Sequence, residues 1–126
     1  MMKVNDKSKT VLEKIFKLVS ENDKYIKLNN NPIFMSLTVE IIEDSVISLC
    51  HYGEQNGDLM RDPEMLFWVE NGNYYPFYFR NDYVGVEEYS GEIIGNKLII
   101  NNTKLQNDHR KFSNMWLQNI KYQQNI

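Results

Sequence analysis

A dense group of side chains that could do chemistry lies in one short stretch, residues 51–64. It begins with His51 and carries four carboxylates and an arginine between two apolar segments. Carboxylates can ligate metal ions or transfer protons, and glycines would let the backbone turn close to a ligand. We therefore expect a polar loop here, with candidate binding residues Glu54, Asn56, Asp58, Arg61, Asp62 and Glu64.

A metal site is one interpretation of this loop. Glu54, Asn56 and Asp58 occupy alternate positions, as oxygen ligands do at the start of a calcium-binding EF-hand loop. An EF-hand has glycine at its sixth position and a bidentate glutamate at its twelfth. Counted from Glu54, Gly57 is fourth and Met65 is twelfth, so the pattern fails. The sequence predicts no metal ligand and no cofactor.

A metal-dependent hydrolase or nuclease is the enzymatic alternative. In it, Asp62 and Glu64 would share one face of a strand and His51 would transfer a proton. No phosphate-binding loop, HExxH, G-x-S-x-G or dinucleotide fingerprint occurs in the chain. Cys50 precedes His51 directly, and successive strand side chains point to opposite faces, so we expect a buried cysteine rather than a nucleophile. No catalytic residue is assigned.

A structural role is the third interpretation of the same residues. Asn56-Gly57 is typical of a tight turn. Arg61 would pair with Glu54, Asp58 or Asp62 and fix the loop against a sheet. Ion pairs and turns need polar clusters just as functional sites do.

A second cluster, residues 74–83, is rich in tyrosine and phenylalanine. On a strand, one set of side chains would line the core, and the other set would face outward. The inward set is Tyr75, Phe77 and Phe79, and the outward set is Tyr74, Pro76, Tyr78 and Arg80. Proline lacks a ladder donor, which favours an edge strand. Exposed tyrosine and arginine are typical of protein interfaces, so Tyr74, Tyr78 and Arg80 are candidate binding residues.

The elements that must position these clusters follow from periodicity and turn signals. Apolar residues at helical spacing predict a helix over 6–21, with Thr10 and Glu13 as a capping box. Strands are predicted over 37–41, 46–52, 65–70, 74–80, 84–89, 93–94 and 98–100. A second helix is predicted to begin at a Thr103 cap. The fold class is α+β: an antiparallel β meander of about five to seven strands flanked by an N-terminal and a C-terminal helix, in a single domain spanning 1–126.

Charge and composition narrow the function classes. The formal net charge is −3 and the pI is near 5.4, so nucleic acid is a disfavoured partner. Apolar runs are short and no secretory signal is recognisable, so we expect no membrane segment and a cytoplasmic location. The single cysteine, Cys50, fits a reducing compartment.

Two motifs resemble an uncharacterised family of small domains from bacterial phages and mobile elements. They are the stretches 51–65 and 75–86, which read HYGEQNGD-x-MRDPEM and YPFYFRNDYVGV. The resemblance covers roughly Val46–Tyr89 and implies an accessory protein, without implying a catalytic residue. We therefore expect a non-catalytic module that binds a protein partner, with inhibition of a host nuclease or defence factor as one form of that role.

Overall fold

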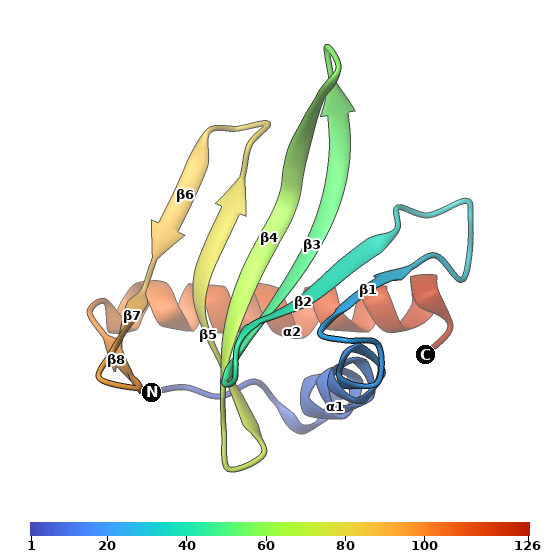
Figure 1. The fold of residues 1–126 in the computed structure, drawn as a ribbon. Coiled ribbons are helices and arrows are strands. Elements are labelled where there is room, and N and C mark those ends of the chain that lie inside the picture. Colours follow the sequence, from blue (N-terminus) through green and yellow to red (C-terminus); the bar gives the residue numbers. More distant parts are fainter.

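Eight strands lie between two helices in the computed structural model, which describes all 126 residues. The expected α+β class is confirmed (Figure 1). In chain order the elements are α1 (Asp6–Ser20), β1 (Tyr25–Leu28), β2 (Leu37–Glu43), β3 (Val46–Gln55), β4 (Asp58–Glu70), β5 (Asn73–Asn81), β6 (Val86–Tyr89), β7 (Gly91–Ile94), β8 (Lys97–Ile100) and α2 (Thr103–Gln124).

Six of the strands form one antiparallel meander in the order β1-β2-β3-β4-β5-β6. Strands β7 and β8 form a separate hairpin, closed by a Gly95-Asn96 turn. Both turn residues have positive φ, as a two-residue hairpin turn requires. The predicted antiparallel meander is confirmed for β2 to β6. The prediction that 93–94 and 98–100 continue it is wrong, because β7 and β8 pair only with each other, and β1 is a strand that the sequence patterns did not reveal.

Both helices pack on the same face of the six-stranded sheet (Figure 1). We call this face the helix side and the opposite face the open side. The main core lies between the helices and the sheet, and its largest fully buried side chain is Phe67. Apolar residues at helical spacing on α1 supply one wall of this core, namely Val11, Leu12, Ile15 and Val19. A smaller core lies on the open side, where Leu98 of β8 covers Trp68 and Phe77.

Asparagine caps the N-terminus of each helix. The Asn5 side chain accepts a hydrogen bond from the Ser8 N–H, and the Asn102 side chain accepts one from Leu105. The predicted capping box at Thr10 is wrong, because the helix begins one turn earlier and the Thr10 hydroxyl donates to the Asp6 carbonyl. The predicted Thr103 cap is wrong by one residue.

Two buried glutamines of α2 bind segments that are distant in the sequence. Gln106 accepts from the Met2 N–H at 3.0 Å and donates to the Met2 and Pro76 carbonyls at 3.1 and 3.3 Å. Gln124 accepts from the Asn30 N–H at 3.1 Å and donates to the Met35 carbonyl at 3.0 Å. The long helix thus fastens the N-terminal segment at one end and the loop before β2 at the other. Neither helix is long and apolar enough to span a membrane.

Candidate functional site

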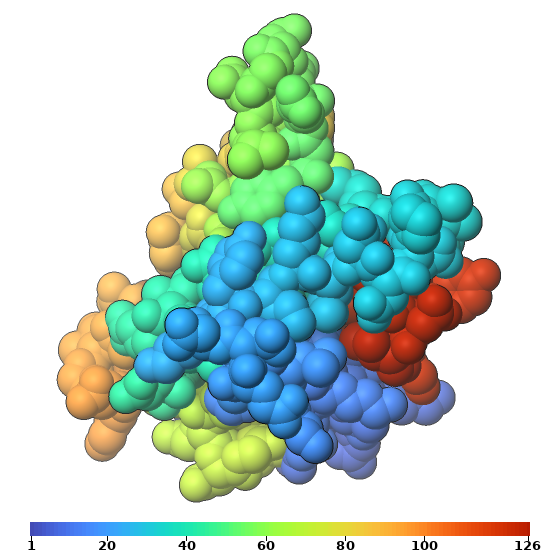
Figure 2. Space-filling view, turned by 45° about the vertical axis from the view of Figure 1, so that its right-hand side comes forward, coloured from blue at the N-terminus to red at the C-terminus, as the bar shows by residue number.

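The predicted polar loop at 51–64 is instead a long β-hairpin that projects from the molecule (Figures 1 and 2). Its ladder runs to Gln55 opposite Asp58, and Asn56 and Gly57 form the turn with φ of 53° and 86°. The predicted tight turn is therefore confirmed, while the expected loop is wrong. Polar residues can occupy these strands because the hairpin extends past the sheet into solvent.

The residues resembling the start of a calcium loop lie at the tip of this hairpin. Glu54 and Asp58 belong to opposite strands and are solvent-exposed, and Asn56 is in the turn. No group of three or more histidine, cysteine, aspartate or glutamate side chains in the chain is arranged to hold a metal ion. The tip is an exposed acidic surface.

Arg61 anchors the base of the hairpin to the connection after β5. Its guanidinium lies 3.6 Å from Glu64 and 3.7 Å from Asp82. Its backbone N–H donates to the Asp82 carboxylate at 2.8 Å, and its carbonyl accepts from the Asp82 N–H at 2.9 Å. The predicted pairing with Glu54, Asp58 or Asp62 is wrong, because the decisive carboxylate comes from 21 residues further along the chain.

The ion pairs continue across β5 and β6 on the open side. Arg80 donates to Asp82 at 2.8 Å and to Glu87 at 3.0 Å, and the Tyr78 hydroxyl donates to Glu87 at 2.6 Å. The backbone N–H of Arg61, followed by Arg80, lowers the pKa of Asp82. Burial, followed by the bond to Glu87, raises the pKa of Tyr78. The candidate residues Arg61, Glu64 and Arg80 thus form one structural network.

The outward aromatic row predicted for β5 does not exist. Tyr74 is 4% exposed and lies in the main core, and Tyr78 is 5% exposed in the smaller core. The register of β4 and β5 shifts where Phe67 pairs with Pro76 and Leu66 pairs with Tyr78, so Phe77 is an extra residue. A bulge of this kind breaks the alternation of faces.

The edge position predicted for β5 is also wrong. Strand β5 lies between β4 and β6. Pro76 precedes the segment of β5 that pairs with β6, which runs from Tyr78 to Asn81. The missing N–H of Pro76 therefore costs no ladder bond to β6.

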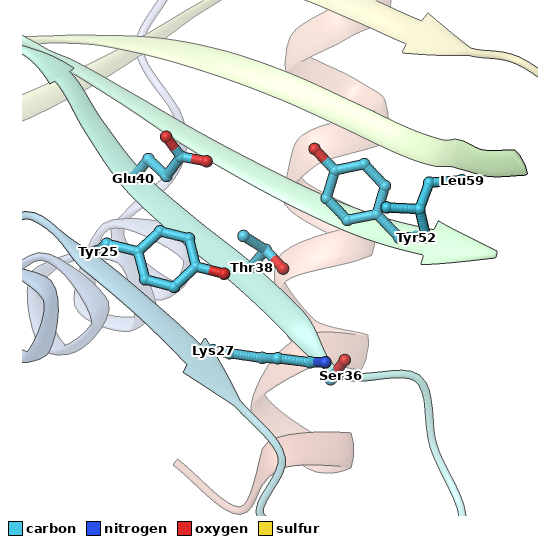
Figure 3. A pocket seen from close by; sticks show the side chains of 7 residues that line it. All are labelled: Tyr25, Lys27, Ser36, Thr38, Glu40, Tyr52 and Leu59. Atoms are coloured by element: carbon cyan, nitrogen blue, oxygen red, sulfur yellow. The ribbon is translucent and has the colours of Figure 1, made fainter. Parts of the chain in front are cut away.

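Exposed aromatic side chains gather instead on the open side of β1 and β3. Tyr25 and Tyr52 flank Thr38 in a groove of about 360 Å³ beside the hairpin (Figure 3). Leu59, 70% exposed, lies at its end near the tip. The remaining lining residues are Lys27, Ser36 and Glu40. The alternation in Tyr25-Ile26-Lys27-Leu28 was the only sequence signal for this strand, and it spans just four residues.

Asp62 and Glu64 do not share a face as predicted. Glu64 accepts from the Ser48 hydroxyl at 2.9 Å and pairs with Arg61, whereas Asp62 accepts from the Asn81 amide at 3.0 Å. The ladder joins Cys50 to Glu64 but Tyr52 to Arg61, so two residues of β4 oppose one of β3. This bulge turns Asp62 away from Glu64.

Cys50 has the environment of a buried apolar residue, as predicted. It is 2% exposed, and burial followed by the charge of Glu64 raises the pKa of its thiol to about 12. Burial also raises the pKa of the neighbouring Tyr52 to about 12. A thiol protonated at neutral pH is a poor nucleophile.

A serine, a histidine and a glutamate form a hydrogen-bonded chain that the sequence did not suggest. Ser90 Oγ lies 2.9 Å from His109 Nδ1, and His109 Nε2 lies 3.2 Å from Glu88. Ser90 is fully buried, and its backbone bonds to Phe77 and to the start of α2. A nucleophile must reach its substrate, and Ser90 is buried. These three hydrogen-bonded residues therefore fasten the β6–β7 corner to α2 rather than forming a catalytic triad.

Comparison with known proteins shows a family but no activity. A family model described as a domain of unknown function (DUF6908) matches residues 7–126. The chain belongs to this family. The DUF6908 match includes both helices, whereas the sequence resemblance covered only the central strands. No curated protein and no solved structure gives a significant match to this DUF6908 chain.

Proposed function

We propose that this protein is a non-catalytic, protein-binding module that presents the β3–β4 hairpin and the adjoining groove to a partner protein. The projection of the hairpin beyond the body of the molecule is the observation that supports this most strongly (Figure 2). It holds Leu59 at 70% exposure, next to the 37% exposed Tyr52. A large aliphatic side chain held this far into solvent has no role in the core of the chain.

The hairpin is held rigidly enough to serve as a recognition element. The Asn56-Gly57 turn fixes its register, and the Arg61–Asp82 contacts tie its base to the sheet. A rigid binding element loses little conformational entropy on association. The ion-pair network therefore supports binding indirectly, by positioning the tip.

The chemistry of the surface indicates the kind of partner. Glu54 and Asp58 are acidic and lie on either side of the tip, while Leu59 and Tyr25 offer apolar area. A complementary partner would have an apolar pocket bordered by lysine or arginine. In this proposal the module works in the cytoplasm as an accessory protein of a phage or mobile element. Inhibition of a host nuclease or defence factor is the form of that role we favour.

The arrangement of the acidic residues favours this function over a metal-dependent hydrolase. Glu54 and Asp58 are at the tip, Glu64 is paired with Arg61, and Asp62 faces the helix side. Hydrolysis assisted by a metal needs several carboxylates that converge on one point. These carboxylates diverge, and no specific contact supports the enzymatic alternative.

The experiment places a photo-crosslinking amino acid at Leu59 of the full chain in cells that express it. The crosslinked partner is identified, purified and titrated against unmodified protein. We expect Leu59→Ser and Asp58→Asn each to raise the dissociation constant about tenfold, an effect typical of residues at the centre of an interface. Matched controls come from the other projecting hairpin, where Ile94→Ser and Glu92→Gln change similarly exposed residues.

The controls should bind within about twofold of the unmodified protein, a difference well below 1.4 kcal/mol. Equal weakening by the two sets of variants would mean that the hairpin has no special part in binding. A crosslinked partner whose affinity is unchanged by Leu59→Ser and Asp58→Asn would overturn the proposal.

A further inference from the structure

A second cavity lies on the helix side of the sheet, away from the groove proposed to bind protein. It has a volume of about 460 Å³ and is bounded by the loop before β2, the base of the β3–β4 hairpin and α2. This volume is in the range of pockets that hold small organic ligands. Met35 and Met115, both partly exposed, lie at its rim, so solvent has access.

Three aromatic side chains line this cavity beside aliphatic and polar ones. Phe112 and Trp116 of α2 line it, together with Phe34 of the loop. The two rings of α2 lie 6.0 Å apart between centroids, with planes inclined by 33°. Flat faces at this spacing favour a planar ligand that can stack or make edge contacts.

Two polar groups of the hairpin base also line the cavity, and one of them has an unsatisfied atom. His51 is 6% exposed, and its buried Nε2 has no hydrogen-bond partner. Its ring meets Trp116 edge to face, with centroids 5.4 Å apart. Leaving a buried polar nitrogen without a partner is unfavourable, so a ligand that bonds to it would recover part of that free energy.

The second polar group is the carboxylate of Asp62. The Asn81 amide donates to its Oδ1 at 3.0 Å, which fixes its orientation and leaves Oδ2 as an acceptor. None of the eleven residues that line the cavity is lysine or arginine. The site therefore favours neutral or cationic N–H donors and disfavours anions.

We propose that this cavity is a binding site for a small planar aromatic molecule with in-plane N–H donors, such as an aryl amidine or an amino-substituted heteroaromatic base. The ring would lie against Trp116 and Phe112. Its N–H groups would donate to Asp62, and His51 Nε2 would gain a polar partner. This inference is independent of the protein-binding role, because the residues involved face the other side of the sheet.

Benzamidine and benzoate provide a matched pair of probes, because they have nearly the same shape and opposite charge. The chain has two histidines, so in protein that carries ¹³C only in histidine the ring signals come from His51 and His109 alone. We expect benzamidine to shift the His51 signals at millimolar concentration and to leave His109, enclosed by Ser90 and Glu88, unchanged. Benzoate should bind at least about tenfold more weakly, because it has no N–H donor for Asp62 and its negative charge is repelled by that carboxylate.

Asp62→Asn should remove most of the difference between the two probes, and its thermal melt reports whether the variant is folded. Equal affinities of benzamidine and benzoate for the unmodified protein would overturn the proposal without any variant. Shifts of both histidines together would indicate binding elsewhere and would also overturn it. Glu92→Gln, which changes an exposed carboxylate on β7, is the control and should leave both affinities unchanged.

Discussion

Gly53 on β3 is the position at which one added methyl group should loosen the hairpin from the body of the sheet. A Cβ built there would lie 2.1 Å from the Tyr83 hydroxyl oxygen, and 3.0 and 3.1 Å from two ring carbons. Tyr83 follows β5, so its ring joins the hairpin to the β5–β6 connection. Gly53→Ala therefore forces the ring away by more than 1 Å, since carbon and oxygen atoms rarely approach closer than about 3.4 Å.

The expected cost is about 1 kcal/mol, the lower end of the range for overpacking by one methyl group, because the Tyr83 ring is 43% exposed and can turn toward solvent. Gly53 has no positive φ, so alanine fits the backbone and should by itself stabilise the strand by roughly 0.5 kcal/mol. In a Tyr83→Ala background the clash is absent, and Gly53→Ala should then be neutral or stabilising. The coupling free energy between the two sites is therefore about 1.5 kcal/mol, within the range for residues in contact.

Urea unfolding of the four proteins of this cycle measures the coupling. For a small domain with a slope of about 1–2 kcal/mol per molar urea, Gly53→Ala should lower the midpoint by roughly 1 M. The same substitution should leave the midpoint of the Tyr83→Ala protein unchanged or raise it. Equal decreases in the two backgrounds would refute the argument that the Tyr83 ring is what the new methyl group meets.

Three further predictions concern the stability of the fold. Burial lowers the pKa of both His51 and His109, so the unfolded chain binds more protons than the folded one below about pH 6.5. The free energy of unfolding should therefore fall from pH 7 to pH 5, and His109→Gln should make this fall smaller. A urea midpoint that does not change with pH would contradict the prediction. Phe67→Ala should cost about 3–5 kcal/mol by calorimetry or urea unfolding, because Phe67 is fully buried, and a loss below 1 kcal/mol would show that the site repacks. Asn5→Ala should lower the free energy of unfolding by about 1 kcal/mol because the helix cap is lost, whereas Thr10→Ala should be nearly neutral. A larger loss of melting temperature in Thr10→Ala than in Asn5→Ala would contradict this and support Thr10 as the cap.

Local signals explain which parts of the fold could be predicted. Asn56-Gly57, Asn71-Gly72 and Gly95-Asn96 all form turns with positive φ, because asparagine and glycine accept that conformation at low cost. A tight turn makes the strands on either side of it antiparallel neighbours. The meander could therefore be predicted from the few residues that form its turns. Strand β1 was missed because its four residues are too few to establish a period of two.

The candidate site was predicted less well, because bulges decide which way its side chains point. One bulge opposite His51 separates Asp62 from Glu64, and another at Phe77 places Tyr78 in a core. A bulge depends on the pairing of two strands, and neither strand alone shows it. Composition correctly located the polar hairpin, but the partners of Arg61 depended on a contact that spans 21 residues.

The two buried glutamines of α2 impose an order on folding during synthesis. The N-terminal segment and the loop before β2 leave the ribosome long before Gln106 and Gln124, which supply the side-chain partners for their backbone groups. Until α2 emerges, the helix side of the finished meander is covered by α1 alone. Contacts between residues 104 and 94 positions apart are also slow to form, because long loops must close first. A nascent chain that stalls before residue 103 would therefore expose the part of its apolar layer that α2 covers, and chaperone binding is expected at that stage.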